Sequence, residues 1–375
     1  MKNKVRWNYV FKYAGSVAAF IIGSGFATGQ EILQFFSAYG TRGISGALLT
    51  MLLLAATCAI IMDLGYQNRK GKLGNIYYYC CGKRLGRFME WFTPIFCFLM
   101  LAVMISGAGA TLNQYMGLPP LAGRVMMTAL TVIVVFGGLN RLINIIGCLG
   151  PFTIIVTLII GVLSIARTPV SLAEIDQIIA TAEHVPYSTG NSRGFWPLAS
   201  VLYAAYNMTC SLPFMSEMGA TAQSRKEAIL GGVLGSVALM LSGLILALAM
   251  MVNFKNVSVL DIPVLYLAQR ISPLLGSLFT AVLLGEIFST ATPLLWTATN
   301  AFAGPEGTFK NRAGVLMVAI AAFGASVFPF GALVGTIYPF TGYIGSSLIV
   351  CVIVRFLHES RNPKNKPEKL KMHKS

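Results

Sequence analysis

Charged side chains are scarce in this sequence. Asp, Glu, Lys and Arg make up only 11% of its 375 residues, whereas a soluble domain has about 25%. A soluble protein of this size would lack the polar groups that its surface needs, which excludes a cytosolic enzyme, a disordered chain and a secreted disulfide module. Hydrophobic residues reach 55%, with a mean hydropathy of +0.71. Repeated apolar runs of about 20 residues are typical of bilayer-spanning helices, so the composition predicts an all-α integral membrane protein.

Catalytic and metal-binding motifs are also missing. The seven cysteines show no C-x-x-C spacing, which argues against a metal or redox site. A G-x-S-x-G pattern occurs at 190–194, but in a predicted exterior loop without the strand and helix that a nucleophile elbow requires. The sequence contains no ATPase motif, and GSGFATG departs from the dinucleotide fingerprint in its glycine spacing. We therefore expect no enzyme and no bound cofactor.

The apolar residues fall into ten segments, each long enough to be a transmembrane helix or most of one. Their approximate bounds are 10–39, 43–66, 88–115, 121–139, 142–166, 195–218, 228–252, 272–302, 313–328 and 331–357.

The placement of Lys and Arg predicts the orientation of these spans. If both termini are cytoplasmic, 22 of the 28 basic residues lie on the inside and six on the outside, as the positive-inside rule requires. The formal net charge of +15 is then explained by topology and by affinity for anionic lipid headgroups. We expect a multi-pass protein of the cell membrane, with the lipid bilayer and a small solute as partners and no nucleic acid; the oligomeric state stays open.

Ten spans divide into two halves of five, and an odd-numbered half inserts upside down relative to its sibling, as in inverted-repeat transporters. Three pairs of landmarks recur at offsets of 184 to 188 residues: Gly23 with Asn207, Glu31 with Glu217, and Pro151 with Pro339. The predicted organisation is a first five-helix repeat (1–166), an extracellular connector with a short helix (167–194), a second repeat (195–357) and a basic cytoplasmic tail (358–375).

The first span contains a predicted break. Residues 21–31 read IIGSGFATGQE, and three glycines within seven residues weaken a helix. Unwound backbone survives in a membrane only where it lines a protein cavity, with N–H groups that suit a carboxylate and C=O groups that suit a cation. Close helix packing through small residues is the alternative. Gln30 and Glu31 favour function, because carboxylates inside the membrane are rare.

The sixth span carries a matching irregularity. Residues 203–217 read YAAYNMTCSLPFMSE, with Asn207 and Thr209 near the middle and then Pro213, whose ring removes a helical hydrogen bond. Interrupted spans at corresponding places in two halves indicate a binding site at the membrane midplane. We therefore predict that both the first and the sixth helix are interrupted.

These motifs resemble a known superfamily. GSGFATGQ at 23–30 resembles the first-helix element of the amino acid–polyamine–organocation superfamily, whose members share the LeuT-type fold, and residues 204–229 resemble its sixth helix and the following loop. The whole chain is most similar to YkvI-like bacterial membrane proteins. The resemblance implies a solute site at Gly23, Ser24, Gly25, Phe26, Tyr203, Tyr206, Asn207 and Met208, with the amides of Ser24, Gly25 and Phe26 facing a solute carboxylate.

The resemblance also implies a sodium site, formed by the carbonyls of Ala19 and Ile22 and the hydroxyls of Ser289 and Thr290. Phe26 stands where sodium-coupled amine transporters place an Asn, so no second ion site is expected. Residues 142–166 lack the lysine that proton-coupled relatives can carry, which favours sodium. Glu286 is not part of the family pattern.

Glu31 and Glu286 are either ion ligands and proton carriers or partners in structural hydrogen bonds. The favoured function is a sodium-coupled symporter of a small solute, such as an amino acid, working by alternating access. Two alternatives remain. One is a non-transporting, ligand-sensing receptor subunit of the spore germination type; the other is a proton-coupled transporter that uses Glu286 or Glu31.

Overall fold

The computed structural model describes residues 5–69, 75–137, 149–168, 170–189, 195–300, 303 and 308–361. Within these ranges the regular structure is entirely helical, which agrees with the all-α class expected from the sequence. The helices are α1 (Trp7–Ile21), α2 (Ser24–Thr28), α3 (Gln30–Phe35), η1 (Ser37–Tyr39), α4 (Thr41–Gln67), α5 (Ile76–Met116), α6 (Pro120–Gly137), α8 (Leu149–Arg167), α9 (Leu172–Ala180), α10 (Trp196–Thr221), α11 (Arg225–Val252), α12 (Phe254–Val257), α13 (Pro263–Ile271), α14 (Pro273–Asn300), α15 (Phe309–Ala325) and α16 (Phe330–Arg361).

Five helices of the described chain are individually long and apolar enough to cross a bilayer: α4, α5, α11, α14 and α16. Each of the ten predicted segments overlaps a helix or a group of short helices, although residues 142–148 of the fifth lie outside the described ranges. The count of ten crossings and the inverted repeat remain predictions. The pattern at 190–194 and the tail beyond Arg361 also lie outside the described residues.

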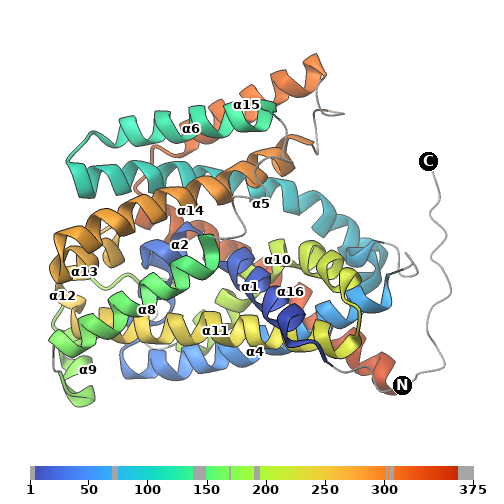
Figure 1. The fold of residues 1–375 in the computed structure, drawn as a ribbon, viewed down its shortest axis with the longest axis horizontal. Coiled ribbons are helices and arrows are strands. Elements are labelled where there is room, and N and C mark those ends of the chain that lie inside the picture. Colours follow the sequence, from blue (N-terminus) through green and yellow to red (C-terminus); the bar gives the residue numbers. More distant parts are fainter. Residues whose placement is uncertain are drawn as a thin grey trace.

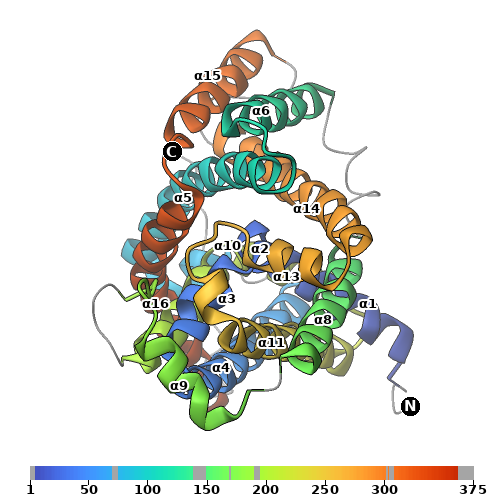
Figure 2. The ribbon, with the colours of Figure 1, turned by 90° about the vertical axis from the view of Figure 1, so that its left-hand side faces the viewer.

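The long helices form two groups with a central layer between them. Helices α5, α6, α14 and α15 pack against one another, and so do α1, α4, α10 and α11. Figures 1 and 2 both show α6 and α15 at one edge of the molecule, α4 and α11 at the other, and α2 and α10 in between. The α16 helix contacts both α10 and α5, and α8 contacts both α11 and α14, so these two helices link the groups.

Helices α4 and α10 approach at backbone distance. The Cα of Gly65 lies against the carbonyl of Ser216, and the Cα of Gly219 lies against the carbonyl of Met62, so a Cβ at either glycine would overlap the neighbouring backbone. Without a hydrophobic driving force between helices in lipid, small residues permit the close packing that holds membrane helices together. This contact fixes the position of α10, which carries several of the predicted site residues.

The predicted interruption of the sixth helix is wrong, because α10 runs without a break from Trp196 to Thr221. Pro213 does remove the hydrogen bond that a backbone N–H would donate to the carbonyl of Thr209. The hydroxyl of Tyr77, from α5, donates to that carbonyl at 3.3 Å. A neighbouring helix thus satisfies the group that Pro213 frees, which is how membrane helices tolerate proline.

The connector contains the expected short helix, α9 (Leu172–Ala180). The carboxylate of Asp176 accepts hydrogen bonds from the backbone N–H of Thr41 at 2.9 Å and from its hydroxyl at 2.7 Å. Since Thr41 is the first residue of α4, this contact attaches the connector to the end of that helix.

Candidate functional site

The first helix is interrupted in its middle. It ends at Ile21, Ile22 has ψ 109°, Gly23 is extended with φ −109° and ψ −178°, and the five-residue helix α2 then begins at Ser24. In the described chain, the carbonyls of residues 19–22 accept no backbone hydrogen bond from beyond α1, and the N–H groups of residues 23–26 donate none to backbone carbonyls. The C=O groups of residues 19–22 and the N–H groups of residues 23–26 are therefore available to other partners, and they are neighbours along the chain.

A second turn brings α3 back toward this break. Gly29 has φ +90°, a left-handed conformation that glycine adopts without steric cost, and it joins α2 to α3. The side chain of Glu31 consequently folds over α2, where its carboxyl lies directly against the Cα of Gly25. The backbone N–H of Phe26 also faces this carboxyl. The family resemblance assigns the amides of residues 24–26 to a solute carboxylate. In the structure, the carboxyl of Glu31 lies beside Gly25 and the N–H of Phe26.

Glu31 is the centre of a buried polar cluster. Only 2% of its surface is exposed, and its Oε2 accepts a hydrogen bond from the hydroxyl of Tyr206. The hydroxyls of Tyr203 and Tyr338 face the same carboxyl. The Tyr203 side chain is fully buried. We call Glu31, Tyr203, Tyr206 and Tyr338 the Glu31 cluster.

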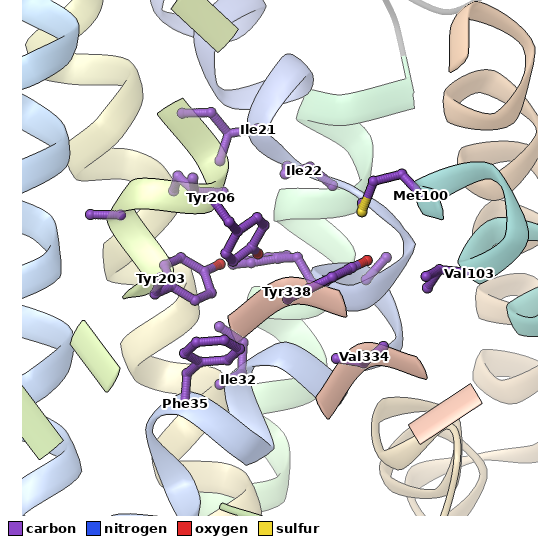
Figure 3. Packing of buried hydrophobic residues seen from close by; sticks show 14 of the residues in the cluster. Ile21, Ile22, Ile32, Phe35, Met100, Val103, Tyr203, Tyr206, Val334 and Tyr338 are labelled. Carbon is purple, nitrogen blue, oxygen red and sulfur yellow. The ribbon is translucent and has the colours of Figure 1, made fainter. Parts of the chain in front are cut away.

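The rings of the Glu31 cluster pack against one another. The ring centroids of Tyr206 and Tyr338 are 4.8 Å apart, and those of Tyr203 and Tyr206 are 5.4 Å apart in an edge-to-face arrangement. Phe35 of α3 adds a further ring, 5.4 Å from that of Tyr203. Figure 3 shows these aromatic side chains from α3, α10 and α16 gathered at one place. The result is a carboxylate enclosed by aromatic rings from three helices.

Two other predicted site residues of α10 are oriented differently. The side-chain amide of Asn207 donates to the carbonyl of Tyr203 at 2.9 Å, within its own helix. Met208 lines a small apolar gap with Ile61 of α4 and Leu348 of α16. The structure therefore brings Tyr203, Tyr206, Phe26 and Glu31 together and shows other contacts for Asn207 and Met208.

The predicted ion-site residues lie on α1 and α14. Ile22 is buried and Ala19 is half-buried, and both belong to the set of carbonyls left free by the break. On α14, the hydroxyl of Ser289 donates to the carbonyl of Glu286 at 2.9 Å, and Thr290 is half-buried. Since a hydroxyl oxygen that donates still has lone pairs, Ser289 keeps the capacity to accept a cation.

Glu286 is, like Glu31, a buried carboxyl without an ion pair in the described chain, and 2% of its surface is exposed. Its Oε2 accepts a hydrogen bond from the hydroxyl of Thr153, on α8, at 3.3 Å. The carboxyl therefore lies where α14 packs against α8, one turn from Ser289 and Thr290. Hydroxyl, carbonyl and carboxylate oxygens are the ligands that hard cations prefer.

Two ion pairs connect the helices near the N-terminal end of α1. At the N-terminal end of α1, the Arg6 side chain pairs with Glu227 at 3.1 Å, and Arg225 makes two bonds of 2.6 and 2.7 Å to the buried carboxylate of Asp63. The guanidinium and carboxylate planes match in such a two-bond pair, which makes it directional as well as strong. These pairs hold α1 and α4 to the start of α11.

Amide side chains attach α3 to the segments before α13 and at the start of α16. The amide of Gln30 donates to the carbonyl of Leu260 at 2.5 Å, and that of Gln34 donates to the carbonyl of Gly331 at 2.9 Å. The carboxylate of Asp261 accepts from the N–H of Gly331 at 3.0 Å. Hydrogen bonds to two distant segments therefore hold the helix that carries Glu31.

Sequence reasoning missed Tyr338. The residue precedes Pro339, which was noted only as a repeat landmark, and a tyrosine in an apolar run is not a distinctive signal. Only the packing of α16 against α10 shows that its ring lies beside Tyr206. Tyr77, whose hydroxyl binds the carbonyl that Pro213 frees, was also missed, because it lies outside the ten predicted spans.

The fold is that of known membrane transporters. The structure matches MhsT in complex with L-phenylalanine over 94% of this chain and 88% of that one, with a TM-score of 0.58 and 13% identity. It matches a Na⁺-coupled sialic acid symporter over 94% and 97%, with a TM-score of 0.51 and 15% identity. It matches a manganese transporter of Eremococcus coleocola over 97% and 74%, with a TM-score of 0.50 and 14% identity. These neighbours are transporters rather than enzymes, and such identities show the fold alone.

Curated relatives carry the same resemblance. The chain is 24% identical to the uncharacterized membrane protein YkvI of Bacillus subtilis over 354 residues, covering 92% of this chain and 94% of YkvI. It is 23% identical to the uncharacterized protein YyaD of the same organism over 353 residues, covering 93% and 97%. No family model matches the chain. The similarity to YkvI-like proteins and to LeuT-type transporters is confirmed, and the chain is a multi-pass membrane protein.

Proposed function

We propose that the protein is a secondary active transporter that moves a small solute by alternating access. The observation that carries this proposal is the interruption of the first helix at Ile22 and Gly23, beside the buried carboxyl of Glu31. Free backbone groups inside a membrane are stable only where something binds them or where they line a cavity. The transporter fold of the neighbouring structures supports the same conclusion.

The proposed solute carries an amine, as amino acids do, and the proposed coupling ion is sodium. The carbonyls of Ala19 and Ile22 would bind sodium together with the hydroxyls of Ser289 and Thr290. An ion that crosses the membrane with its gradient supplies about 2.3 kcal/mol per charge for each 100 mV of membrane potential, so coupling needs no ATPase.

Proton coupling is the second candidate, and one contact favours it. Glu286 is buried within one turn of Ser289 and Thr290, and in the described chain its carboxylate has a hydroxyl partner, Thr153, and no ion pair. A carboxyl in this position can take up a proton in place of a metal ion.

Transport currents of the full chain in proteoliposomes would separate these candidates. A panel of amino acids and small amines is added with sodium or without it, and then with a proton gradient alone. We expect a solute-dependent current that requires sodium and is lost in Ser289→Ala and Thr290→Ala. Thr280→Ala is the matched control, because Thr280 is a buried α14 hydroxyl that bonds to its own helix. A current that persists without sodium and disappears in Glu286→Gln would show that the coupling ion is the proton and not sodium. Binding without flux would favour the receptor alternative.

A further inference from the structure

Within the described residues, the Glu31 carboxyl has hydrogen-bond donors around it but no positively charged side chain. The hydroxyl of Tyr206 donates to it, and the hydroxyls of Tyr203 and Tyr338 and the N–H of Phe26 face it. The two ion pairs of the described chain, Arg6 with Glu227 and Arg225 with Asp63, lie at the ends of helices and leave Glu31 out. A buried carboxylate without a cation is costly in a low-dielectric interior, so Glu31 either holds a proton or takes its countercharge from a ligand.

Basic residues are absent from four of the helices around Glu31 and lie far along a fifth. Helices α2, α3, α10 and α14 contain no Lys, Arg or His, and those of α16 (Arg355, His358 and Arg361) come 17 or more residues after Tyr338. Two of them do contain buried carboxyls, Glu31 on α3 and Glu286 on α14. These four helices therefore have carboxyl groups that attract a cation and no basic side chain that attracts an anion.

Glu31 occupies part of the position that a solute carboxylate would take at the break. The N–H of Phe26 faces Glu31, and the Glu31 carboxyl lies against Gly25, which is where the family resemblance places the carboxylate of an amino acid. A second ionised carboxylate placed against Gly25, next to an ionised Glu31, would be strongly repelled in the apolar interior. The chain's own Glu31 takes the position that an amino acid would need.

Aromatic rings complete the chemistry of a cation site. The rings of Tyr203, Tyr206, Tyr338 and Phe35 lie together in one group (Figure 3). The hydroxyls of the three tyrosines face the Glu31 carboxyl. Aromatic faces attract ammonium groups, and the attraction grows when the cation is removed from water. A carboxylate together with several rings is the combination that recognises an organic cation.

We propose that the transported solute is an organic cation without a carboxylate, such as a primary amine or a quaternary ammonium compound, and that its positive group pairs with Glu31. This inference rests on the proposed transport function and narrows its substrate class. The solute supplies the countercharge that the chain lacks, and a zwitterionic amino acid is the weaker ligand.

Matched pairs of compounds test this directly. Phenethylamine is compared with L-phenylalanine, putrescine with L-ornithine, and choline with glycine betaine, by the rise in the unfolding midpoint of the purified full chain. In each pair that responds, we expect the cation to bind at least tenfold more tightly than its carboxylate-bearing partner. The inference is overturned if no cation in the panel raises the midpoint, or if an amino acid binds as well as its amine.

A substitution at Glu31 tests whether this residue binds the positive group of the solute. Glu31→Gln is expected to lower the affinity for the responding amine at least tenfold, whereas Glu217→Gln, which changes an exposed carboxyl on α10, leaves it unchanged. Unchanged affinity in Glu31→Gln contradicts the inference, and the wild-type comparison decides the matter alone if this variant does not fold. Glu31-dependent amine binding without flux would reject transport but keep the solute class. Amino acid flux that is indifferent to Glu31→Gln would keep transport and reject the solute class.

Discussion

Gly25 is the residue that permits Glu31 to reach the broken helix. Its Cα lies directly beneath the Glu31 carboxyl, so any side chain at this position would occupy the same space. The sequence shows that residues 23–29 are rich in glycine, but three glycines in a helix have several explanations. The structure separates them: Gly25 makes room for a side chain, whereas Gly29 provides a left-handed turn.

We expect Gly25→Ala to displace the Glu31 carboxyl from α2. Because the added methyl group must be accommodated in a packed interior, the free energy of unfolding should fall by about 1–3 kcal/mol. The measurement is thermal unfolding of the purified protein. Gly23→Ala is the comparison for stability, since the nearest atom to its Cβ would be Cε of Met104 at 4.0 Å. Equal stability of the two variants would show that Glu31 does not lie against Gly25.

At the scale of the element, residues that weaken helices occur both in the first span and in α10, yet of these two only the first span is interrupted. Pro213 frees the carbonyl of Thr209, and Tyr77 binds it from α5, so α10 continues. In the first span, Gly23 is extended and Gly29 has φ +90°, and the backbone groups between α1 and α2 make no helical hydrogen bonds across the break in the described chain. The sequence contains both irregularities, but the partner that repairs one of them comes from a helix more than 100 residues away.

Gly29→Ala tests whether the second turn positions α3. The substitution meets two penalties, a left-handed backbone and a Cβ that would lie 2.7 Å from Cγ2 of Val264 and 2.9 Å from Cε of Met250. Gly117→Ala is the matched control, because Gly117 has φ +67° and nothing within 4 Å of its Cβ.

The control should lose roughly 1–2 kcal/mol of stability for the backbone alone. Gly29→Ala should lose a further 1–3 kcal/mol or so from overpacking, and with it the ability to bind solute. The readouts are thermal unfolding and the solute-induced rise in the unfolding midpoint. Similar losses in both variants would mean that packing at Gly29 contributes nothing.

At the scale of the whole molecule, the distribution of charge predicts the orientation in the membrane. Basic residues cluster in the segments assigned to the cytoplasm, and the acidic stretch of the connector, with Glu174 and Asp176, is assigned to the outside. Glu174 of α9 and Arg84 of α5 are both exposed, so each is accessible to a reagent on its own side of the membrane.

Cysteine labelling in intact cells checks this orientation. In a chain without its native cysteines, we expect Glu174→Cys to react with a membrane-impermeant maleimide and Arg84→Cys to react only after the cells are permeabilised. The reverse pattern would place the termini outside and would contradict the predicted orientation.

The sequence by itself determined the class of the protein, because hydropathy and scarce charge leave a polytopic helical membrane protein as the remaining solution. It also located the break in the first helix, since a run of glycines is a strong local signal, and it singled out Glu31, whose role stays a prediction. Only the tertiary structure decided that α10 continues past Pro213, that Tyr338 joins Tyr206, and that Glu31 turns back onto Gly25. Those outcomes depend on contacts between segments that are distant in the sequence. A local sequence pattern does not show which distant hydroxyl or carboxyl will bind a freed backbone group.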